Sequence, residues 1–207
     1  MTADLSILLP ELSAALPGAS VAHCRNAGPA GQDSLLVAPE SLPAVMRWLR
    51  DTPGQEFDFL SNVTGVDWPD PAVAAKVLTV EGADAPAATG FLEVVYHLYS
   101  TTRRVGPLVL RARTADRSAD VTLPSVTGIF RSADFQEREI FDLFGVVFAG
   151  HPDLRRILMW DEFVDHPMRK DYVPPSDHEY EPTPHDQILV LAERHLNPPP
   201  ATPASNP

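Results

Sequence analysis

The sequence predicts an α+β fold in which a small, mostly antiparallel sheet is covered by helices and followed by a long irregular C-terminal extension. Residues 91–100 alternate in side-chain character with the period of a half-buried strand. Residues 133–144 carry apolar side chains at helical spacing. Periodicity is lost after Gly150, and residues 173–207 hold nine of the 22 prolines, which excludes long helices there.

The N-terminal half supplies further helices and strands. Leucines at near-helical spacing within residues 1–20 predict a short amphipathic helix. Ser41 is suited to cap a helix that runs to Arg50, and the dipeptide Pro53-Gly54 ends it. Strands are expected at 34–37, at 57–62 and, within the Ala-, Pro- and Gly-rich connection 67–90, at 77–80.

The C-terminal half completes the sheet and its cover. Residues 109–113 are expected to pair antiparallel with residues 91–100. A short helix is expected to open at Ser125 or Thr127. The helix over 133–144 should end at Gly145, which is placed for a left-handed cap.

We therefore expect two parts, an α+β domain at 1–145 and an extended, proline-rich, partner-wrapping segment at 146–207. Pro152 and Pro167 each follow a histidine and push it toward extended backbone. Helical turns in the tail are expected only within 187–196. Much of 151–172 should need a partner to bury its aromatic side chains.

The charge of the chain argues against some partners. Its 207 residues carry a formal net charge of -12, and the sequence pI is about 4.9. Phosphate backbones and anionic lipid surfaces attract the opposite sign, so nucleic acid and direct membrane binding are not expected. Local basic doublets could still dock onto an acidic partner.

A single cysteine, Cys24, limits the sites that the chain can build. One cysteine excludes an internal disulfide and a four-cysteine iron–sulfur or zinc site. The sequence contains no glycine-rich phosphate loop and no apolar run of about 18 residues. Its first residues lack the Lys or Arg that precedes the apolar part of a signal peptide.

Residues 137–172 form the most informative stretch. Charges of both signs alternate there with large apolar side chains, and two His-Pro pairs, His151-Pro152 and His166-Pro167, are each followed by a basic doublet. A solvated surface does not need so many aromatic residues, and a plain core does not tolerate so many charges. This mixture is typical of a protein–protein interface.

Other readings of the same residues are weaker. His151, Asp153, His166 and Asp171 could gather a metal ion, but histidines in such segments more often bond backbone carbonyls or carboxylates. Carboxylates of the 133–144 helix could act as general acids or bases, although such a helix face is usually solvated or salt-bridged. The basic doublets could bind phosphate, but they pair more often with carboxylates. Cys24 has no paired histidine motif that would make it a nucleophile.

The order of these motifs resembles one known family. EREIFDLFGVVFAGHPDLRRILM, followed by DEFVDHPMRKDY, is similar to the C subunit of bacterial NADH-quinone oxidoreductase, respiratory complex I. Upstream, LSNVTGVDWPD, FLEVVYHLYS and LPSVTGIFRSADFQEREIFDLFG follow the same family in the same order. The resemblance covers roughly residues 57–172 and extends to related subunits of membrane-bound hydrogenases and photosynthetic complex I-like enzymes.

The resemblance implies a non-catalytic structural subunit, peripheral on the cytoplasmic side of the cell membrane. Such subunits hold no cofactor, because FMN, the iron–sulfur clusters and quinone lie on other subunits. They pack against the quinone-site subunit and the cluster-bearing subunits of the hydrophilic arm. The whole complex transfers electrons from NADH to quinone and pumps protons. It is therefore an enzyme in which this chain would carry no catalytic residue.

We expect the partner interface to lie on residues of the 137–172 stretch. The candidates are Glu137, Arg138, Glu139, Asp142, Phe144, Gly145, His151, Pro152, Arg155, Arg156, His166, Pro167, Arg169, Lys170, Asp171 and Tyr172. At least one guanidinium of Arg155 and Arg156 is expected to bridge carboxylates. Two alternatives stay open: the equivalent subunit of a membrane-bound hydrogenase or ferredoxin-linked complex, and a stand-alone metal-dependent hydrolase that uses His151, Asp153 and His166.

Overall fold

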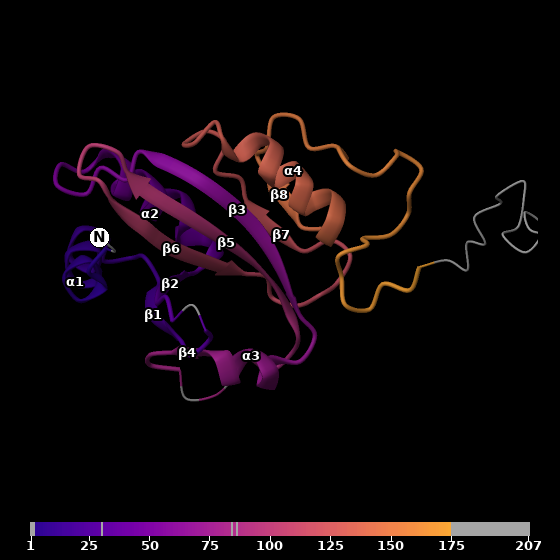
Figure 1. Ribbon diagram of the computed structural model, residues 1–207, viewed down its shortest axis with the longest axis horizontal. Coiled ribbons are helices and arrows are strands. Elements are labelled where there is room, and N and C mark those ends of the chain that lie inside the picture. Colours follow the sequence, from indigo (N-terminus) through magenta and orange to yellow (C-terminus); the bar gives the residue numbers. More distant parts are fainter. Residues whose placement is uncertain (1–2, 30, 84, 86, 175–207) are drawn as a thin grey trace, which may run out of the picture. The chain divides into compact units, whose positions relative to one another are not determined.

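The structure, a computed structural model, describes residues 3–29, 31–83, 85 and 87–174 (Figure 1). One compact unit, Met1–Tyr172, contains every helix and strand of the described residues. Residues 146–172 therefore belong to the same unit as the sheet. The helical turns expected within 187–196 lie outside the described residues.

The main sheet has six strands in the order β3-β5-β6-β2-β1-β4. All neighbours are antiparallel except β2 and β6, so the predicted fold class is confirmed. The strands are β1 (Val21–Asn26), β2 (Ser34–Val37), β3 (Phe59–Trp68), β4 (Leu78–Val80), β5 (Phe91–Ser100) and β6 (Val105–Arg113). A second sheet pairs β7 (Thr122–Pro124) with β8 (Val147–Ala149) in parallel.

Four α-helices accompany the sheet within the described part of the chain: α1 (Leu5–Ala15), α2 (Leu42–Asp51), α3 (Pro71–Val77) and α4 (Ala133–Phe144). One turn of 3-10 helix, η1 (Pro39–Ser41), leads into α2. The apolar sides of α1, α2 and α4 share one core with the sheet. Helix α4 lies along β3, where Gln136 accepts the Val63 N–H and Ser132 donates to the Leu60 carbonyl.

Strand β5 is more deeply buried than its sequence pattern predicts. Its apolar even-numbered residues, from Leu92 to Leu98, join the main core as expected, but Glu93 is fully buried and Val95 is only 4% exposed. Glu93 is stabilised there because Arg111 and Arg113 of β6 contact its two oxygens at 2.6 and 2.8 Å. The Trp68 indole also donates to this carboxylate. Long polar side chains from neighbouring strands thus cover the face that was expected to be solvated.

Several elements differ from the predicted ones. Strand β3 runs on to Trp68 and β6 begins at Val105, both beyond the expected ranges. The sequence pattern did not predict β1, α3, β7 or β8. Residues 127–129 form a turn, and no short helix opens at Ser125 or Thr127. The Ser125 hydroxyl accepts the Thr127 N–H and donates to Glu137, so a contact with α4 fixes this segment.

The predicted left-handed cap of α4 is confirmed at Gly145, whose φ is 78°. A Cβ atom built on Gly145 would lie 2.5 Å from Nε2 of His166, so the cap also brings the chain close to a later segment. Gly150 has a similar φ of 84°, but a Cβ atom there would meet nothing within 4 Å. The two glycines therefore share a left-handed backbone and differ in whether a neighbouring side chain lies close by.

Gly145→Ala should destabilise the fold more than Gly150→Ala. A left-handed alanine costs about 1–2 kcal/mol at either position. Only at position 145 must the His166 ring also move. Urea unfolding of both variants measures the difference. Equal losses of stability would show that His166 does not hold its place against α4.

Candidate partner interface

Residues 151–172, here called the strap, cross α4 without forming a helix or strand (Figure 1). The strap contains most of the residues that the sequence singled out. Its path is fixed by polar contacts with the body of the same chain. Two buried aspartates, Asp142 and Asp67, each accept contacts from the strap.

Asp142 lies in the last turn of α4 and is fully buried. One carboxylate oxygen, Oδ2, accepts the backbone N–H groups of Ile157, Leu158 and Met159 at 3.0, 2.7 and 2.9 Å. The other oxygen, Oδ1, accepts from Arg156 at 2.7 Å. Burial acts to raise the pKa of this carboxyl, but the three amides and Arg156 together hold it below its ordinary value. The carboxylate is therefore a charged anchor for the strap.

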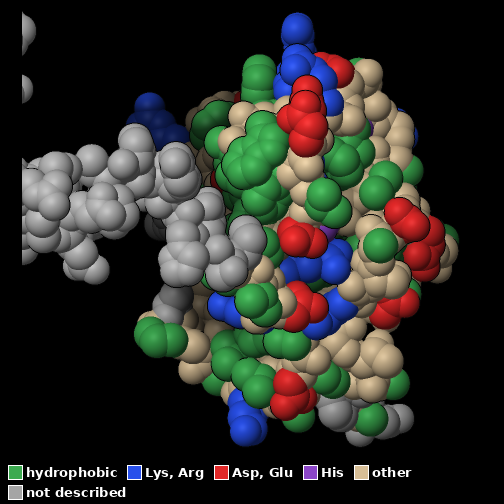
Figure 2. All heavy atoms as spheres, turned by 90° about the vertical axis from the view of Figure 1, so that its right-hand side faces the viewer, with side chains coloured by type: hydrophobic (Ala, Val, Ile, Leu, Met, Phe, Trp, Pro, Cys, Tyr) green, Lys and Arg blue, Asp and Glu red, His purple; other side chains and the backbone are tan. Residues whose placement is uncertain are grey.

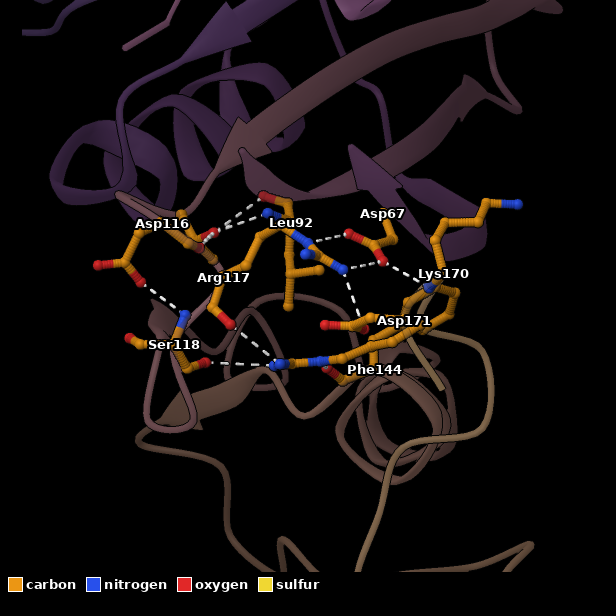
Figure 3. Close-up of polar contacts among 10 residues, drawn as sticks. Asp67, Leu92, Asp116, Arg117, Ser118, Phe144, Lys170 and Asp171 are labelled. Atoms are coloured by element: carbon orange, nitrogen blue, oxygen red, sulfur yellow. Dashed lines mark hydrogen bonds and ion pairs between the residues drawn. The ribbon is translucent and has the colours of Figure 1, made fainter. Parts of the chain in front are cut away.

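Asp67, at the end of β3, anchors the last part of the strap (Figure 3). Arg117 grips its two oxygens at 2.6 and 2.7 Å, and the Lys170 N–H donates to it at 2.7 Å. Arg117 also reaches Asp171 at 3.0 Å. Burial opposes ionisation, yet Arg117 and the Lys170 amide hold the pKa of Asp67 below its ordinary value. This two-pronged contact is the guanidinium geometry that binds carboxylates most firmly.

Arg169 joins the strap to the end of α4 and to the loop at residues 117–118. Its guanidinium donates to the backbone carbonyls of Phe144, Arg117 and Ser118 at 2.6, 3.0 and 3.2 Å. The Phe144 carbonyl belongs to the end of α4, where backbone acceptors lack helical partners. A cation at this end also interacts favourably with the helix dipole.

Both histidines of the His-Pro pairs act inside the chain. His151 accepts the Asp153 N–H on Nδ1, so its Nε2 carries the proton and donates to the Asp134 carbonyl at 3.1 Å. His166 donates from Nδ1 to the Asp142 carbonyl at 2.9 Å. Burial lowers the pKa of His166, which favours the neutral ring. Within residues 3–174, apart from the few left undescribed, no three His, Cys, Asp or Glu side chains gather as a metal site would require.

The candidate interface residues divide by burial. Five of them, Glu137, Arg138, Asp142, Phe144 and Gly145, are buried and serve the chain itself. Glu139, Pro152, Arg155, Lys170 and Asp171 are exposed, and the remaining six, His151, Arg156, His166, Pro167, Arg169 and Tyr172, lie between. Direct contact with a partner is thus open chiefly to the exposed residues, while the buried ones shape the surface.

The two arginines of the first doublet have different roles. Arg156 points inward, where it contacts the Asp142 carboxylate and donates to the carbonyls of Asp142 and Asp165. Arg155 is exposed and pairs with Asp153 beside it at 2.9 Å. The fork between a guanidinium and two carboxylates occurs at Arg117, which joins Asp67 to Asp171 and which the sequence reasoning did not single out. No local pattern marks Arg117, because Asp67 lies 50 residues earlier.

The surroundings of Glu137 differ from those of Asp142, because they contain no charged donor. Glu137 is fully buried, and it accepts hydrogen bonds from the Ser125 hydroxyl at 2.6 Å and the Val126 N–H at 2.7 Å. Neither donor carries a charge. Burial therefore raises the pKa of Glu137 to about 7.

The outer side of the strap leaves apolar side chains in solvent. Trp160 is 63% exposed, and Val164 is 86% exposed. Leu158 and Met168 are also exposed. Figure 2 looks onto this side and shows hydrophobic side chains next to acidic and basic ones. Such a mixture on a folded surface is characteristic of contact sites between proteins.

Comparison with known proteins identifies the family. Residues 35–178 match the family described as respiratory-chain NADH dehydrogenase, 30 Kd subunit. The chain belongs to this family. It is 38% identical over 171 residues to the C subunit of NADH-quinone oxidoreductase from Roseiflexus sp., a match that covers 83% of this chain and 85% of that protein.

Longer relatives also match. The C/D subunit of NADH-quinone oxidoreductase from Bacteroides fragilis is 38% identical over 162 residues, which covers 78% of this chain. The match spans only 28% of the length of that relative. The membrane-bound sulfane sulfur reductase, an archaeal respiratory membrane complex, contains a chain of the same fold. That chain is 17% identical, with a TM-score of 0.55 and 98% of both chains covered.

None of the helices in the described residues is long and apolar enough to cross a membrane.

Asp142→Asn should loosen the strap. The amide has one acceptor oxygen in place of two and no charge for Arg156, so the loss should be about 3 kcal/mol. Limited trypsin digestion should then cleave after Arg155 and Arg156 much faster than in the wild type, while the body stays intact. Asp153→Asn is the matched control, because that carboxylate is 57% exposed and pairs with the exposed Arg155 beside it. Equal cleavage of the two variants would contradict the anchoring role of Asp142.

Glu137→Gln should change how stability depends on pH. Between about pH 4.5 and 7 the folded carboxyl keeps a proton that the unfolded one has lost, so the wild type loses stability as pH rises through this window. Glutamine removes this loss and still accepts the Val126 N–H. The stability of the variant relative to the wild type should rise by about 3 kcal/mol from pH 4.5 to above pH 7. Urea titrations at several pH values measure it, and a constant difference would mean that Glu137 does not titrate in this range.

Proposed function

We propose that this chain is a non-catalytic structural subunit of a proton-pumping NADH-quinone oxidoreductase. In this role it packs against the quinone-site subunit and the iron–sulfur subunits, so that the assembly transfers electrons from NADH to quinone. The strap is the observation that supports this most strongly. Its polar contacts are made inside the chain, and its apolar side chains are left outside for a partner. Membership in the family of 30 kDa subunits supports the choice of this complex.

We propose further that the chain itself holds no cofactor. Cys24 is buried in β1, and burial raises the pKa of its thiol, which disfavours the thiolate that metals bind. FMN, the iron–sulfur clusters and quinone would lie on other subunits. The assembly would place the chain at the cytoplasmic side of the cell membrane, attached through its partners.

A stand-alone hydrolase finds no support in the geometry. His151 uses both ring nitrogens on backbone groups, and His166 uses Nδ1 on the Asp142 carbonyl while its other nitrogen faces Gly145. Neither histidine is free to share a metal with Asp153. A subunit of a hydrogenase or ferredoxin-linked complex would have the same fold. The relatives from Roseiflexus and Bacteroides have NADH-quinone oxidoreductase names, which favours that complex.

The proposed function is tested in the native host. A tagged copy replaces the natural gene, and the tagged chain is purified from detergent-solubilised membranes. It should copurify with an assembly that reduces quinone with NADH, and membranes from a deletion strain should lose that activity. A chain that purifies alone, together with full activity in the deletion strain, would exclude the proposed function.

Trp160→Ala should weaken incorporation into the complex. Exposed tryptophans often carry a large share of binding energy, so a loss of about tenfold in affinity is expected. Phe59→Ala is the control. Phe59 is also exposed, at 49%, but it lies on β3 and is not part of the strap. Native gels of solubilised membranes report the incorporated fraction of each variant. Full incorporation of the Trp160 variant would show that the outer side of the strap is not part of the interface.

A further inference from the structure

The strap presents a charge to its surroundings that differs from the one its sequence suggests. From the sequence alone, its basic doublets favour an acidic partner. In the structure Arg156 is occupied by Asp142, and Arg169 is occupied by backbone carbonyls of α4 and the 117–118 turn. Arg117, supplied by the body, is occupied by Asp67 and Asp171. One arginine of each doublet therefore faces inward, whereas Arg155 and Lys170 stay exposed, and Arg155 pairs with Asp153.

The carboxylates that remain face outward. Asp161, Glu162 and Asp165 are all exposed. Their side chains take part in none of the hydrogen bonds or ion pairs found among the described residues. A turn in which the Phe163 N–H donates to the Trp160 carbonyl at 3.0 Å places Asp161 and Glu162 at its tip. The Trp160 and Phe163 rings meet edge to face at 4.9 Å and stiffen this turn.

Apolar side chains lie within the same short run. Leu158 is 55% exposed, Trp160 63% and Val164 86%. Each lies within a few positions of the acidic residues, and Figure 2 shows hydrophobic and acidic side chains adjacent on this face. We call Leu158, Trp160 and Val164, together with Asp161, Glu162 and Asp165, the acidic apolar surface.

We propose that the acidic apolar surface docks into an apolar recess that is rimmed by lysine and arginine side chains on a partner protein. This proposal rests on the proposed function and adds the chemistry of the partner to it. Its apolar residues would supply affinity, and its acidic residues would supply orientation and a fast association rate. Anionic lipid is a poorer occupant because it repels carboxylates. A second copy of this chain is poorer as well, because it would bring the same charges against themselves.

The surface is built before any partner arrives. The amides of residues 157–159, which include Leu158 at the start of the acidic apolar surface, donate to Asp142. The Met168 N–H donates to the Leu143 carbonyl, and Lys170 is held on Asp67. Fixed points on both sides of the run reduce the entropy that a partner must overcome to bind it.

Charge reversal tests the proposal in the full complex. The variant Asp161→Lys/Glu162→Lys/Asp165→Lys is expressed with a tag beside untagged wild type in the native host. Competition for a limited number of assemblies then reports relative affinity. The variant should be incorporated roughly tenfold to a hundredfold less than a tagged wild-type chain. Washing with salt should release the wild type progressively, because its ionic contacts are screened, and should change the small incorporated fraction of the variant far less.

A matched control carries the same change of charge elsewhere. Glu11→Lys/Glu40→Lys/Glu56→Lys reverses three carboxylates on α1 and around α2 that form no ion pair among the described residues, and it should compete as well as the wild type. Normal incorporation of the strap variant would overturn the proposal, and so would an equal defect in the control. Stronger incorporation of the strap variant would point to an acidic partner, and self-association of the purified wild type through this surface would point to a second copy. Absence of the tagged wild type from any assembly would instead reject the proposed function itself.

Discussion

The geometry of the strap depends on one buried carboxylate, that of Asp142. An ion in a protein interior is stable only when polar groups replace the water that it has lost. Here three successive backbone N–H groups and one guanidinium, all from the strap, supply that replacement. The strap depends on the carboxylate in turn, because it has no helix or strand of its own in which those amides would find acceptors. The carboxylate and the segment that covers it therefore fold as one structure.

This internal use of charge decides what the outside of the molecule offers. A segment of mixed charge can turn either sign toward solvent, and the body of this chain shifts the balance toward carboxylates by holding the guanidinium groups of Arg156 and Arg169 inside. The apolar side chains between the anchors cannot join the core, because the backbone next to them is already fixed to α4. The same contacts that organise the strap thus leave Trp160 and Val164 in water. A surface of this kind gains stability only when another protein covers it.

Local signals predicted α4 and its end at Gly145, because helical spacing and a left-handed cap are properties of neighbouring residues. They also predicted most of the sheet. The full burial of Glu93 could not be predicted, because the arginines that stabilise it come from another strand. The role of Arg117 could not be predicted for the same reason, because its partner Asp67 lies far away in the sequence. In the strap the residue types indicated an interface, but a segment without periodicity has no predictable face, so the direction of each side chain had to come from the structure.

Asp142 and Glu137 lie on the same helix and are both fully buried, yet their pKa values move in opposite directions. Position on the helix does not explain this, because the negative end of the helix dipole lies near Asp142 and should favour its protonated form. The number and kind of donors explain it. Asp142 receives three amides and a cation from the strap, whereas Glu137 receives one hydroxyl and one amide and no cation. The strap thus both buries Asp142, which opposes its ionisation, and supplies the donors that outweigh this burial. In the folded chain the charge of this buried carboxylate therefore depends on the same segment whose outer side we assign to a partner.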